Sequence, residues 1–318
     1  MKTKVSTDRD AAVELLRKGE VVALPTETVY GLAADALNLR AVTKIFEAKE
    51  RPRFDPLIVH LPDRDWLEKI ADLPAQDRQL ISKLTEAFWP GPFTIVLPKR
   101  DAVPDIVTAG LETVAVRISS HPIFAEIIRA FGSPLAAPSA NRFGRISPTT
   151  AQHVRDELDG RIALIVDAGV TMHGIESTIV AIHAGKMELL RRGPIAEEQL
   201  AKFCEVTLST HGAVRAPGQL ASHYAPHTRL SLITDPASFV PAQNQRCGLL
   251  AWRRAAKQYS EVRVLSCAGD LREAAANLFR YLRELDQPGL DLIVAEKVPA
   301  KGLGHAINDR LSRAANFN

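Results

Sequence analysis

Short apolar runs recur along the chain and constrain its fold more than any other feature. Residues 21–24 form a β-branched run that ends at Pro25. Runs of this length, bounded by turn residues, are typical of buried strands rather than of helices. The same pattern predicts strands at residues 57–61, 93–97, 114–118, 135–137 and 163–166. The first half of the chain is therefore predicted to contain several short buried strands.

Helical segments and one hairpin are predicted between and after these strands. Residues 41–50 and 80–88 have helical periodicity, the first with its apolar side chains on one face. Residues 178–183 and 187–191 flank the turn Ala184-Gly185-Lys186, which indicates a hairpin. Because the strands and helices do not follow a strict βαβ repeat, we predict a mixed α/β fold.

A second, smaller unit is predicted after a change of character near residue 195. Residues 214–219 contain Pro217-Gly218 and carry neither strand nor helix periodicity, so they indicate a linker. Beyond it, strands are predicted at residues 230–234, 248–251, 262–265 and 292–295, and helices at 271–285 and 306–315. This pattern predicts a small α/β layer domain.

Composition narrows the class of protein. A chain of 318 residues with 46% hydrophobic residues favours two domains. The formal charge of +3 is too near balance for nucleic-acid binding through a global field. The three cysteines, Cys204, Cys247 and Cys267, have no zinc-site spacing. A polar N-terminus and the lack of a long apolar stretch predict neither a signal peptide nor a membrane helix, so we expect a cytoplasmic protein.

Stock catalytic motifs do not occur in the sequence. It contains no GxxxxGK[ST], GxSxG or HExxH pattern, and Gly302-Leu303-Gly304 lacks the third glycine of a dinucleotide fingerprint. Polar residues instead cluster after short apolar runs, where α/β folds place ligands. These clusters are the candidate sites.

Three cations stand at the predicted end of the helix at residues 41–50. Lys49, Arg51 and Arg53 could complement the helix dipole on a solvated surface. Alternatively they form a phosphate clamp, because arginine offers a two-pronged fork and lysine a point charge. Both interpretations stay open from the sequence alone.

Hydroxyl and amide groups follow the strand predicted at residues 135–137. Ser139 and Asn141 could contact a ligand or could bond their own backbone in a turn. Thr149 fits a capping box with Gln152, and Ser147 fits a turn or cap equally well.

Thr28, His60 and Arg117 are candidates on or next to other predicted strands. Thr26 or Thr28 could cap the next helix, and His60 could be a core histidine. Arg117 lies in the apolar run at residues 114–118 and needs an anionic partner, either a ligand carboxylate or a structural Asp or Glu.

The last candidates flank the hairpin and the linker. Ser177 could belong to a turn, Arg191 could be a surface strand residue, and His223 and Tyr224 could pack the linker. Each of these residues could instead reach a ligand.

Taken in order, these segments resemble the threonylcarbamoyl-AMP synthase family, the YrdC/Sua5 group. Over about residues 10–195 the resemblance is carried by PTETVYGLAADA, KERPRFDPLIVH, WPGPFTIVLP, TVAVRISSHP, APSANRFGRISPT, ESTIV and LRRGPI. The later strings APGQLASHYAP and GLGHAINDRLSRAA resemble the linker and the C-terminal end of the two-domain Sua5 form.

The resemblance implies the fold and the reaction. The implied fold is a YrdC-like domain at residues 1–205 with a twisted, open mixed sheet and a concave basic groove. A linker at 206–229 and a small Rossmann-like α/β domain at 230–318 follow it. The implied enzyme, a nucleotidyltransferase, makes threonylcarbamoyl-AMP and pyrophosphate from L-threonine, bicarbonate or CO2, and ATP with Mg2+. A transferase would then modify tRNA next to the anticodon, and weak binding of tRNA or double-stranded RNA is also expected.

The resemblance also implies the roles of individual residues. Catalytic roles fall on Lys49, Arg51, Ser139 and Asn141. L-threonine would contact Thr28, His60, Arg117, Ser139 and Ser177. ATP would contact Lys49, Arg51, Asp55, Thr113, Asn141, Ser147, Thr149, Arg191, His223 and Tyr224. No residue is expected to hold a metal by itself. Asp55 stands where the family commonly has Asn, and a carboxylate there would repel a triphosphate unless it points away or meets Mg2+.

Two other functions remain possible from the residues. One is a carbamoyl-transfer enzyme of the hydrogenase-maturation type, which shares a related site but carries zinc-finger segments that three scattered cysteines do not match. The other is a non-catalytic module that binds double-stranded RNA or tRNA through the basic groove.

Overall fold

The larger part of the molecule is built on a mixed β-sheet. The computed structural model describes all residues except 1, 53, 210–214, 220–222 and 317–318, so Arg53 and residue 214 lie outside the described part. The strands are β1 (Lys4–Ser6), β2 (Val22–Leu24), β3 (Gly31–Asp35), β4 (Ile58–His60), β5 (Phe93–Pro98), β6 (Thr113–Arg117), β7 (Leu135–Ala136), β8 (Leu164–Val166), β9 (Thr178–His183), β10 (Lys186–Arg191) and β11 (Val206–Leu208). In the described residues they form one 11-stranded sheet in the order β1-β8-β2-β3-β7-β4-β6-β5-β9-β10-β11.

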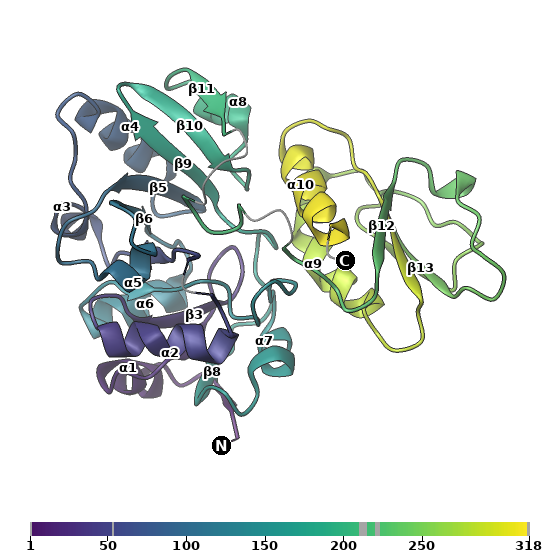
Figure 1. Cartoon of the computed structure of the whole chain (residues 1–318), viewed down its shortest axis with the longest axis horizontal. Coiled ribbons are helices and arrows are strands. Elements are labelled where there is room, and N and C mark those ends of the chain that lie inside the picture. Colours follow the sequence, from purple (N-terminus) through teal and green to yellow (C-terminus); the bar gives the residue numbers. More distant parts are fainter. Residues whose placement is uncertain (1, 53, 210–214, 220–222, 317–318) are drawn as a thin grey trace.

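Helices cover both sides of this sheet, as Figure 1 shows. They are α1 (Arg9–Arg17), α2 (Leu39–Lys49), α3 (Leu67–Ile70), α4 (Arg78–Phe88), α5 (Asp105–Thr108), α6 (Pro122–Phe131), α7 (Ala151–Leu158), α8 (Glu197–Leu200) and the 3-10 turn η1 (Arg64–Trp66). Alternate residues of a strand point to opposite faces. Accordingly, Ala23 belongs to the apolar cluster that includes side chains of α2 and α4, whereas Val22 and Leu24 belong to the cluster with side chains of α1 and α6.

The side of the sheet that carries α1 and α6 is only partly covered by helices. On this side Ile58, Ala115, Ile179 and Leu190 form a separate apolar cluster with Ala216 of the linker. The linker thus contributes Ala216 to an apolar cluster on this face of the sheet. This arrangement leaves room for a pocket between the sheet and the linker.

The C-terminal part contains a four-stranded parallel sheet. Its strands are β12 (Leu230–Ile233), β13 (Cys247–Ala251), β14 (Glu261–Val264) and β15 (Leu292–Glu296), in the order β12-β15-β13-β14. Its helices are α9 (Leu271–Leu285), α10 (Leu303–Ala315) and the 3-10 turn η2 (Pro236–Ser238). Figure 1 shows α9 and α10 between this sheet and the larger part of the molecule. The C-terminal part therefore faces the larger part of the molecule with its helices, and its sheet lies on the far side of those helices.

The predicted α/β fold class is confirmed, and most predicted strands and helices occur within two residues of their expected bounds. The predicted hairpin is the antiparallel pair β9 and β10. The predicted domain boundaries at residues 205 and 229 stay predictions. Residues 206–208, placed in the linker, form β11, which pairs with β10 and extends the large sheet.

One local expectation was wrong. No helix begins near Thr26 or Thr28, because the next described element is β3, which pairs antiparallel with β2 and β7. The Thr26 hydroxyl instead accepts hydrogen bonds from the backbone N–H groups of Thr28 and Val29, which closes a turn between the two strands. β3 was missed because its alanines do not distinguish a strand from a helix.

The end of α2 directs the predicted phosphate clamp toward the sheet. The helix begins after Asn38, whose side chain accepts from the backbone N–H groups of Arg40 and Ala41. It ends at Glu50, which adopts a left-handed conformation with φ of 55°. This reversal places Lys49 and Arg51 in buried positions, so the solvated-surface alternative was wrong.

Candidate active site

A pocket lies on the face of the sheet that the linker covers. Its walls bring together nine of the predicted site residues, which come from β4, β6, β10, the connecting loops and the linker: Thr28, Arg51, His60, Arg117, Ser139, Ser177, Arg191, His223 and Tyr224. His60 and Arg117 are paired across the parallel strands β4 and β6. A shared sheet face, rather than a common strand end, unites these residues, because β7 runs antiparallel to β4.

Arg117 is paired with a structural carboxylate. Its guanidinium forms a buried ion pair with Glu27 and also donates to the Thr28 hydroxyl over 3.3 Å. Burial raises the pKa of Glu27, but Arg117 and the Ser119 hydroxyl outweigh burial and hold that pKa below its usual value. Arg117 Nε lies buried without a hydrogen-bond partner among the described residues. One N–H of the guanidinium therefore has no acceptor among the described residues.

His60 presents a neutral imidazole to the pocket. Its ring centroid lies 4.7 Å from that of Phe124 on α6. Burial and the charge of Arg117 lower the pKa of His60 well below its usual value. Nδ1 has no hydrogen-bond partner in the described part of the chain. Both sequence interpretations hold in part, since His60 is packed in the core and also lines the pocket.

Lys49 lies behind the pocket wall rather than in it. Its ammonium group donates to the carbonyl of Ser139 over 2.5 Å and also to the carbonyl of Asn141. Burial, with the nearby Arg51, lowers the pKa of Lys49 well below its usual value. The Asn141 amide donates to the carbonyls of Arg142 and Arg145. Lys49 and Asn141 thus shape the loop that presents Ser139.

Arg51 lines the pocket and compensates Asp55. Arg51 Nη2 lies 2.8 Å from Asp55 Oδ2, and its Nε donates to the Asp55 carbonyl over 3.2 Å. Burial raises the pKa of Asp55, although Arg51 and Lys49 act in the opposite direction. The Asp55 carboxylate, which the family resemblance places near the triphosphate, therefore forms an ion pair with Arg51.

Arg191 is the pocket arginine with the least charge compensation. Its guanidinium donates to the Ser177 carbonyl, the Ser177 hydroxyl and the Pro217 carbonyl over 3.0, 3.0 and 3.1 Å. Among the described residues, no carboxylate forms an ion pair with it. Burial lowers the pKa of Arg191 to about 10, so the group stays protonated at neutral pH. The surface-strand alternative was wrong because Arg191 is buried.

The linker closes the pocket with two aromatic residues. Tyr224 is 1% exposed and adopts φ of 65°, and its ring stacks on Phe279 of α9 at 5.4 Å. The His223 and Tyr224 ring centroids are 4.1 Å apart. Burial raises the pKa of Tyr224 to about 12, so its hydroxyl stays protonated. That hydroxyl is buried without a hydrogen-bond partner in the described structure, and Tyr224 lines the pocket.

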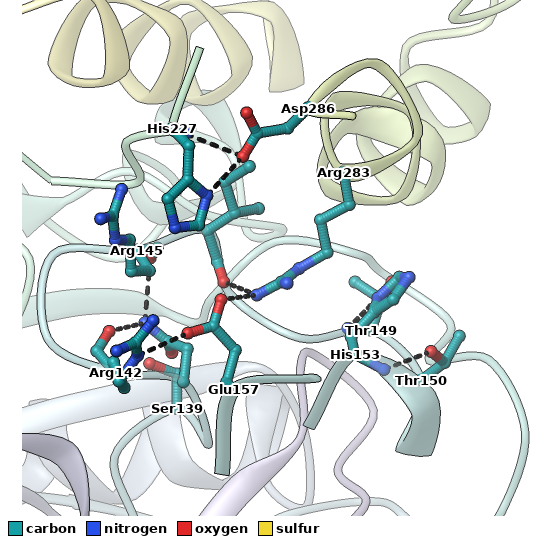
Figure 2. Close-up of polar contacts among 12 residues, drawn as sticks. Ser139, Arg142, Arg145, Thr149, Thr150, His153, Glu157, His227, Arg283 and Asp286 are labelled. Atoms are coloured by element: carbon teal, nitrogen blue, oxygen red, sulfur yellow. Dashed lines mark hydrogen bonds and ion pairs between the residues drawn. The ribbon is translucent and has the colours of Figure 1, made fainter. Parts of the chain in front are cut away.

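Besides Lys49, Asp55 and Asn141, three further predicted nucleotide contacts do not line the pocket. Thr113 begins β6, at the end opposite Arg117. Ser147 lies behind the wall and donates its hydroxyl to Glu176. Thr149 lies beside His153, and Figure 2 shows both apart from Ser139.

The helix cap predicted at Thr149 is one residue too early. Thr150 caps α7, and its hydroxyl accepts from the His153 backbone N–H over 3.2 Å. The cap at Thr150 leaves Thr149 fully buried, with its backbone carbonyl accepting from the Thr171 N–H. A nucleotide contact by Thr149 stays a prediction.

Comparisons with known proteins agree on one family. The family described as "Telomere recombination" matches residues 14–193, and "Threonylcarbamoyl-AMP synthase, C-terminal domain" matches residues 195–316. Proteins named threonylcarbamoyl-AMP synthase from Bacillus subtilis and Pyrococcus abyssi are 43% and 38% identical, each over 96% of this chain, and 92% and 93% of those proteins are covered. The chain belongs to the threonylcarbamoyl-AMP synthase family.

A solved structure in this family matches the whole fold. The crystal structure of P. abyssi Sua5 complexed with L-threonine superposes with a TM-score of 0.89 at 34% identity, covering 99% of this chain and 98% of that one. The Escherichia coli YciO structure matches 60% of this chain and 96% of its own with a TM-score of 0.51 at 20% identity, which shows the fold alone. The YrdC-like fold of the family is therefore confirmed for this chain.

Three charged residues that lie at the site of this family member were not predicted from the sequence. Glu27 pairs with Arg117, and Glu176 lines the pocket beside Ser177. Arg310 of α10 donates to Glu176 over 3.1 Å. A signal for Arg310 was present in the sequence, because it shares a helix face with Ile307 and Leu311, and a buried charge needs a partner.

No group of three or more His, Cys, Asp or Glu side chains that could hold a metal ion occurs in the described part of this family member. Among the same residues, no helix is long and apolar enough to span a membrane.

Acid should destabilise the fold through its buried histidines. Burial, with Arg283 and Arg280 nearby, lowers the pKa of His153 from 6.5 to about 4. The unfolded chain therefore binds more protons below about 6.5, so stability should fall as the pH falls from about 6.5 toward 4. Thermal unfolding at a series of pH values measures this effect. His153→Gln should show a shallower decline, and an identical slope would contradict the assignment.

Proposed function

We propose that this chain is an L-threonylcarbamoyladenylate synthase and thus a nucleotidyltransferase. It takes L-threonine, bicarbonate or CO2, and ATP, and releases threonylcarbamoyl-AMP and pyrophosphate. A transferase then uses the product to modify the tRNA adenosine next to the anticodon. Weak binding of tRNA or double-stranded RNA, through the basic groove that the family resemblance implies, is part of the same proposal.

The observation that carries the proposal is the convergence of three buried arginines in one pocket. Arg51, Arg117 and Arg191 are all buried there. Buried charges require partners, and the carboxylates Asp55 and Glu27 compensate only the first two. Arg191 is left to meet a substrate anion. This arrangement suits a triphosphate, since arginine binds phosphate through charge-assisted hydrogen bonds.

The threonine side of the pocket lies around Arg117. We assign its unpartnered Nε to the substrate carboxylate, and Thr28, His60 and Ser177, which line the same pocket, to the threonine hydroxyl. A methyl pocket alone separates threonine from serine by only about 1 to 3 kcal/mol. Hydrogen bonding to the hydroxyl excludes valine more strongly, because valine leaves buried polar groups unpaired.

The reaction proceeds by positioning and charge stabilisation. The neutral α-amine of threonine attacks CO2 or bicarbonate and gives a carbamate. A carbamate oxygen attacks the α-phosphorus of ATP, and pyrophosphate leaves with its charge balanced by Arg51 and Arg191. No side chain acts as a covalent nucleophile. ATP enters as its magnesium complex, and we assign the Mg2+ to the triphosphate rather than to protein ligands.

One assay tests this function. Incubation of the purified chain with ATP, Mg2+, bicarbonate and threonine should release pyrophosphate and form a threonine-containing AMP adduct, both seen by chromatography and mass spectrometry. Valine in place of threonine should give neither product. Pyrophosphate release that does not depend on threonine would rule the synthase out.

The two other functions make different predictions in the same assay. A carbamoyl-transfer enzyme would turn over ATP with carbamoyl phosphate and without threonine. A non-catalytic RNA-binding module would show no ATP turnover and a steep salt dependence of RNA binding. Membership of the synthase family over both matched regions favours neither alternative.

A further inference from the structure

Arg310, which belongs to the C-terminal part of the chain, places a positive charge next to the pocket wall. It lies on α10, is 1% exposed and shares its helix face with Ile307 and Leu311. Its Nε donates to Glu176 Oε2 over 3.1 Å, and Glu176 lines the pocket next to Ser177. A buried arginine this far from solvent is costly unless it is paired. The pair therefore links α10 directly to the site.

The same guanidinium also packs on the linker. Its carbon lies 5.3 Å from the centroid of the Tyr224 ring, which also stacks on Phe279 of α9. Cation–π packing of this kind stabilises an aromatic ring in one orientation. Tyr224 needs such support because a non-glycine residue with φ of 65° is in a sparsely populated conformation. Arg310 thus contacts both a wall residue and the residue that closes the pocket.

Because Glu176 carries a negative charge, its ion pair with Arg310 should affect binding of the nucleotide. Glu176 is buried in the wall of the pocket that holds Arg51 and Arg191. An uncompensated carboxylate there would repel a triphosphate, and the repulsion would be strong because buried charges are poorly screened. Ser147 donates a hydrogen bond to Glu176, but a hydroxyl adds no positive charge. The ion pair that compensates Glu176 comes from Arg310, whose Nη1 also lies 3.0 Å from Asp309 Oδ2.

We propose that Arg310 is a positioning residue for the nucleotide, because it neutralises Glu176 in the pocket wall and holds Tyr224 over the pocket. This inference rests on the proposed function, in which the bound nucleotide is ATP. It assigns the C-terminal part of the chain a direct role in nucleotide binding. Arg310 itself need not touch the substrate.

Calorimetry with a nonhydrolysable ATP analogue, and separately with threonine, tests the proposal on the full chain. Arg310→Gln should weaken analogue binding at least about tenfold, since truncating one partner of a buried charge pair leaves the other charge uncompensated. Threonine binding should change by less than about twofold, because Glu27 and not Glu176 faces Arg117. Equal losses for the two ligands would overturn the proposal.

A second substitution in the same pair distinguishes electrostatics from general damage. The double variant Arg310→Gln with Glu176→Gln removes both charges and should regain most of the analogue affinity. Glu176→Gln alone should bind the analogue at least as tightly as the unaltered chain, and this variant keeps the proposal testable if Arg310→Gln does not fold. Weaker binding by Glu176→Gln, or no recovery in the double variant, would overturn the proposal.

Arg283 provides a matched control. It lies on α9, is largely buried and pairs with Glu157 of α7 over 3.1 Å, as Figure 2 shows. Like Arg310, it joins the C-terminal part to the larger part, but neither it nor Glu157 lines the pocket. Arg283→Gln should therefore change analogue affinity by less than about twofold. A loss of analogue affinity equal to that of Arg310→Gln would overturn the proposal, because any contact between the two parts would then support analogue binding.

Measuring analogue binding and pyrophosphate release separately distinguishes a failure of this inference from a failure of the proposed function. If the unaltered chain binds the analogue but releases no threonine-dependent pyrophosphate, the synthase assignment fails, while the comparison of variants still tests Arg310. If the unaltered chain binds no analogue, the positioning role of Arg310 is overturned.

Discussion

Arg191→Met is expected to lower threonine-dependent pyrophosphate release at least about 100-fold while it leaves the fold intact. A charge-assisted hydrogen bond contributes about 1.5 to 3 kcal/mol, and Arg191 is expected to make more than one to the triphosphate. No ion pair is broken, because no carboxylate among the described residues pairs with Arg191. Methionine fills similar space without a buried charge but leaves the Ser177 and Pro217 acceptors unpaired, so the unfolding temperature should fall by no more than about 10 °C.

Arg192 supplies the control for this prediction. It is the next residue in the chain, its side chain is 33% exposed, and its guanidinium lies 3.7 Å from Glu197. Arg192→Met removes the same charge outside the pocket and should leave turnover within about twofold. Steady-state kinetics at varied ATP and threonine give the comparison. Similar turnover in both variants would remove Arg191 from the phosphate site.

Arg117→Met is expected to impair both stability and threonine binding. Its removal leaves the Glu27 carboxylate buried without its cation, and breaking a buried pair in this way costs about 3 to 5 kcal/mol. Apparent threonine affinity should fall about tenfold or more, because the substrate carboxylate loses its guanidinium. Affinity for the ATP analogue should fall less.

The double variant Arg117→Met with Glu27→Gln separates these two effects. Glutamine removes the unpaired charge and keeps an acceptor for the Ser119 hydroxyl. Thermal unfolding should therefore show recovery of most of the lost stability, whereas calorimetry should show no recovery of threonine binding. Recovery of threonine binding as well would mean that Arg117 serves only to balance Glu27.

The contrast between these two arginines shows what their sequence context could predict. Arg117 lies within an apolar run, so a need for an anionic partner was evident. The partner could have been a ligand or a side chain, and Glu27 is 90 residues away in the chain. Arg191 gave no such signal, because its position at the end of a hairpin strand fits a surface residue equally well. Arg191 is buried because the linker packs over it, and the local sequence does not encode that contact.

Side-chain contacts at short range were only partly predictable. The helix start at α7 was expected because threonine and glutamine fit a cap, but two adjacent threonines compete for that role and tertiary packing selects Thr150. Lys49 and Arg51 were expected together in one phosphate clamp. The left-handed turn at Glu50 separates them, so Arg51 lines the pocket and Lys49 supports the loop behind it.

The sequence by itself determined the alternation of short strands and helices, the two-part layout and the family motifs, because periodicity and ordered motifs are local properties of the chain. The tertiary structure decided which charges are paired. It joins Glu27 to Arg117 and, across 134 residues, Glu176 to Arg310, and it leaves Arg191 without a carboxylate. Such pairings arise only when distant segments pack on one face of the sheet and lose water, which makes an unpaired charge costly.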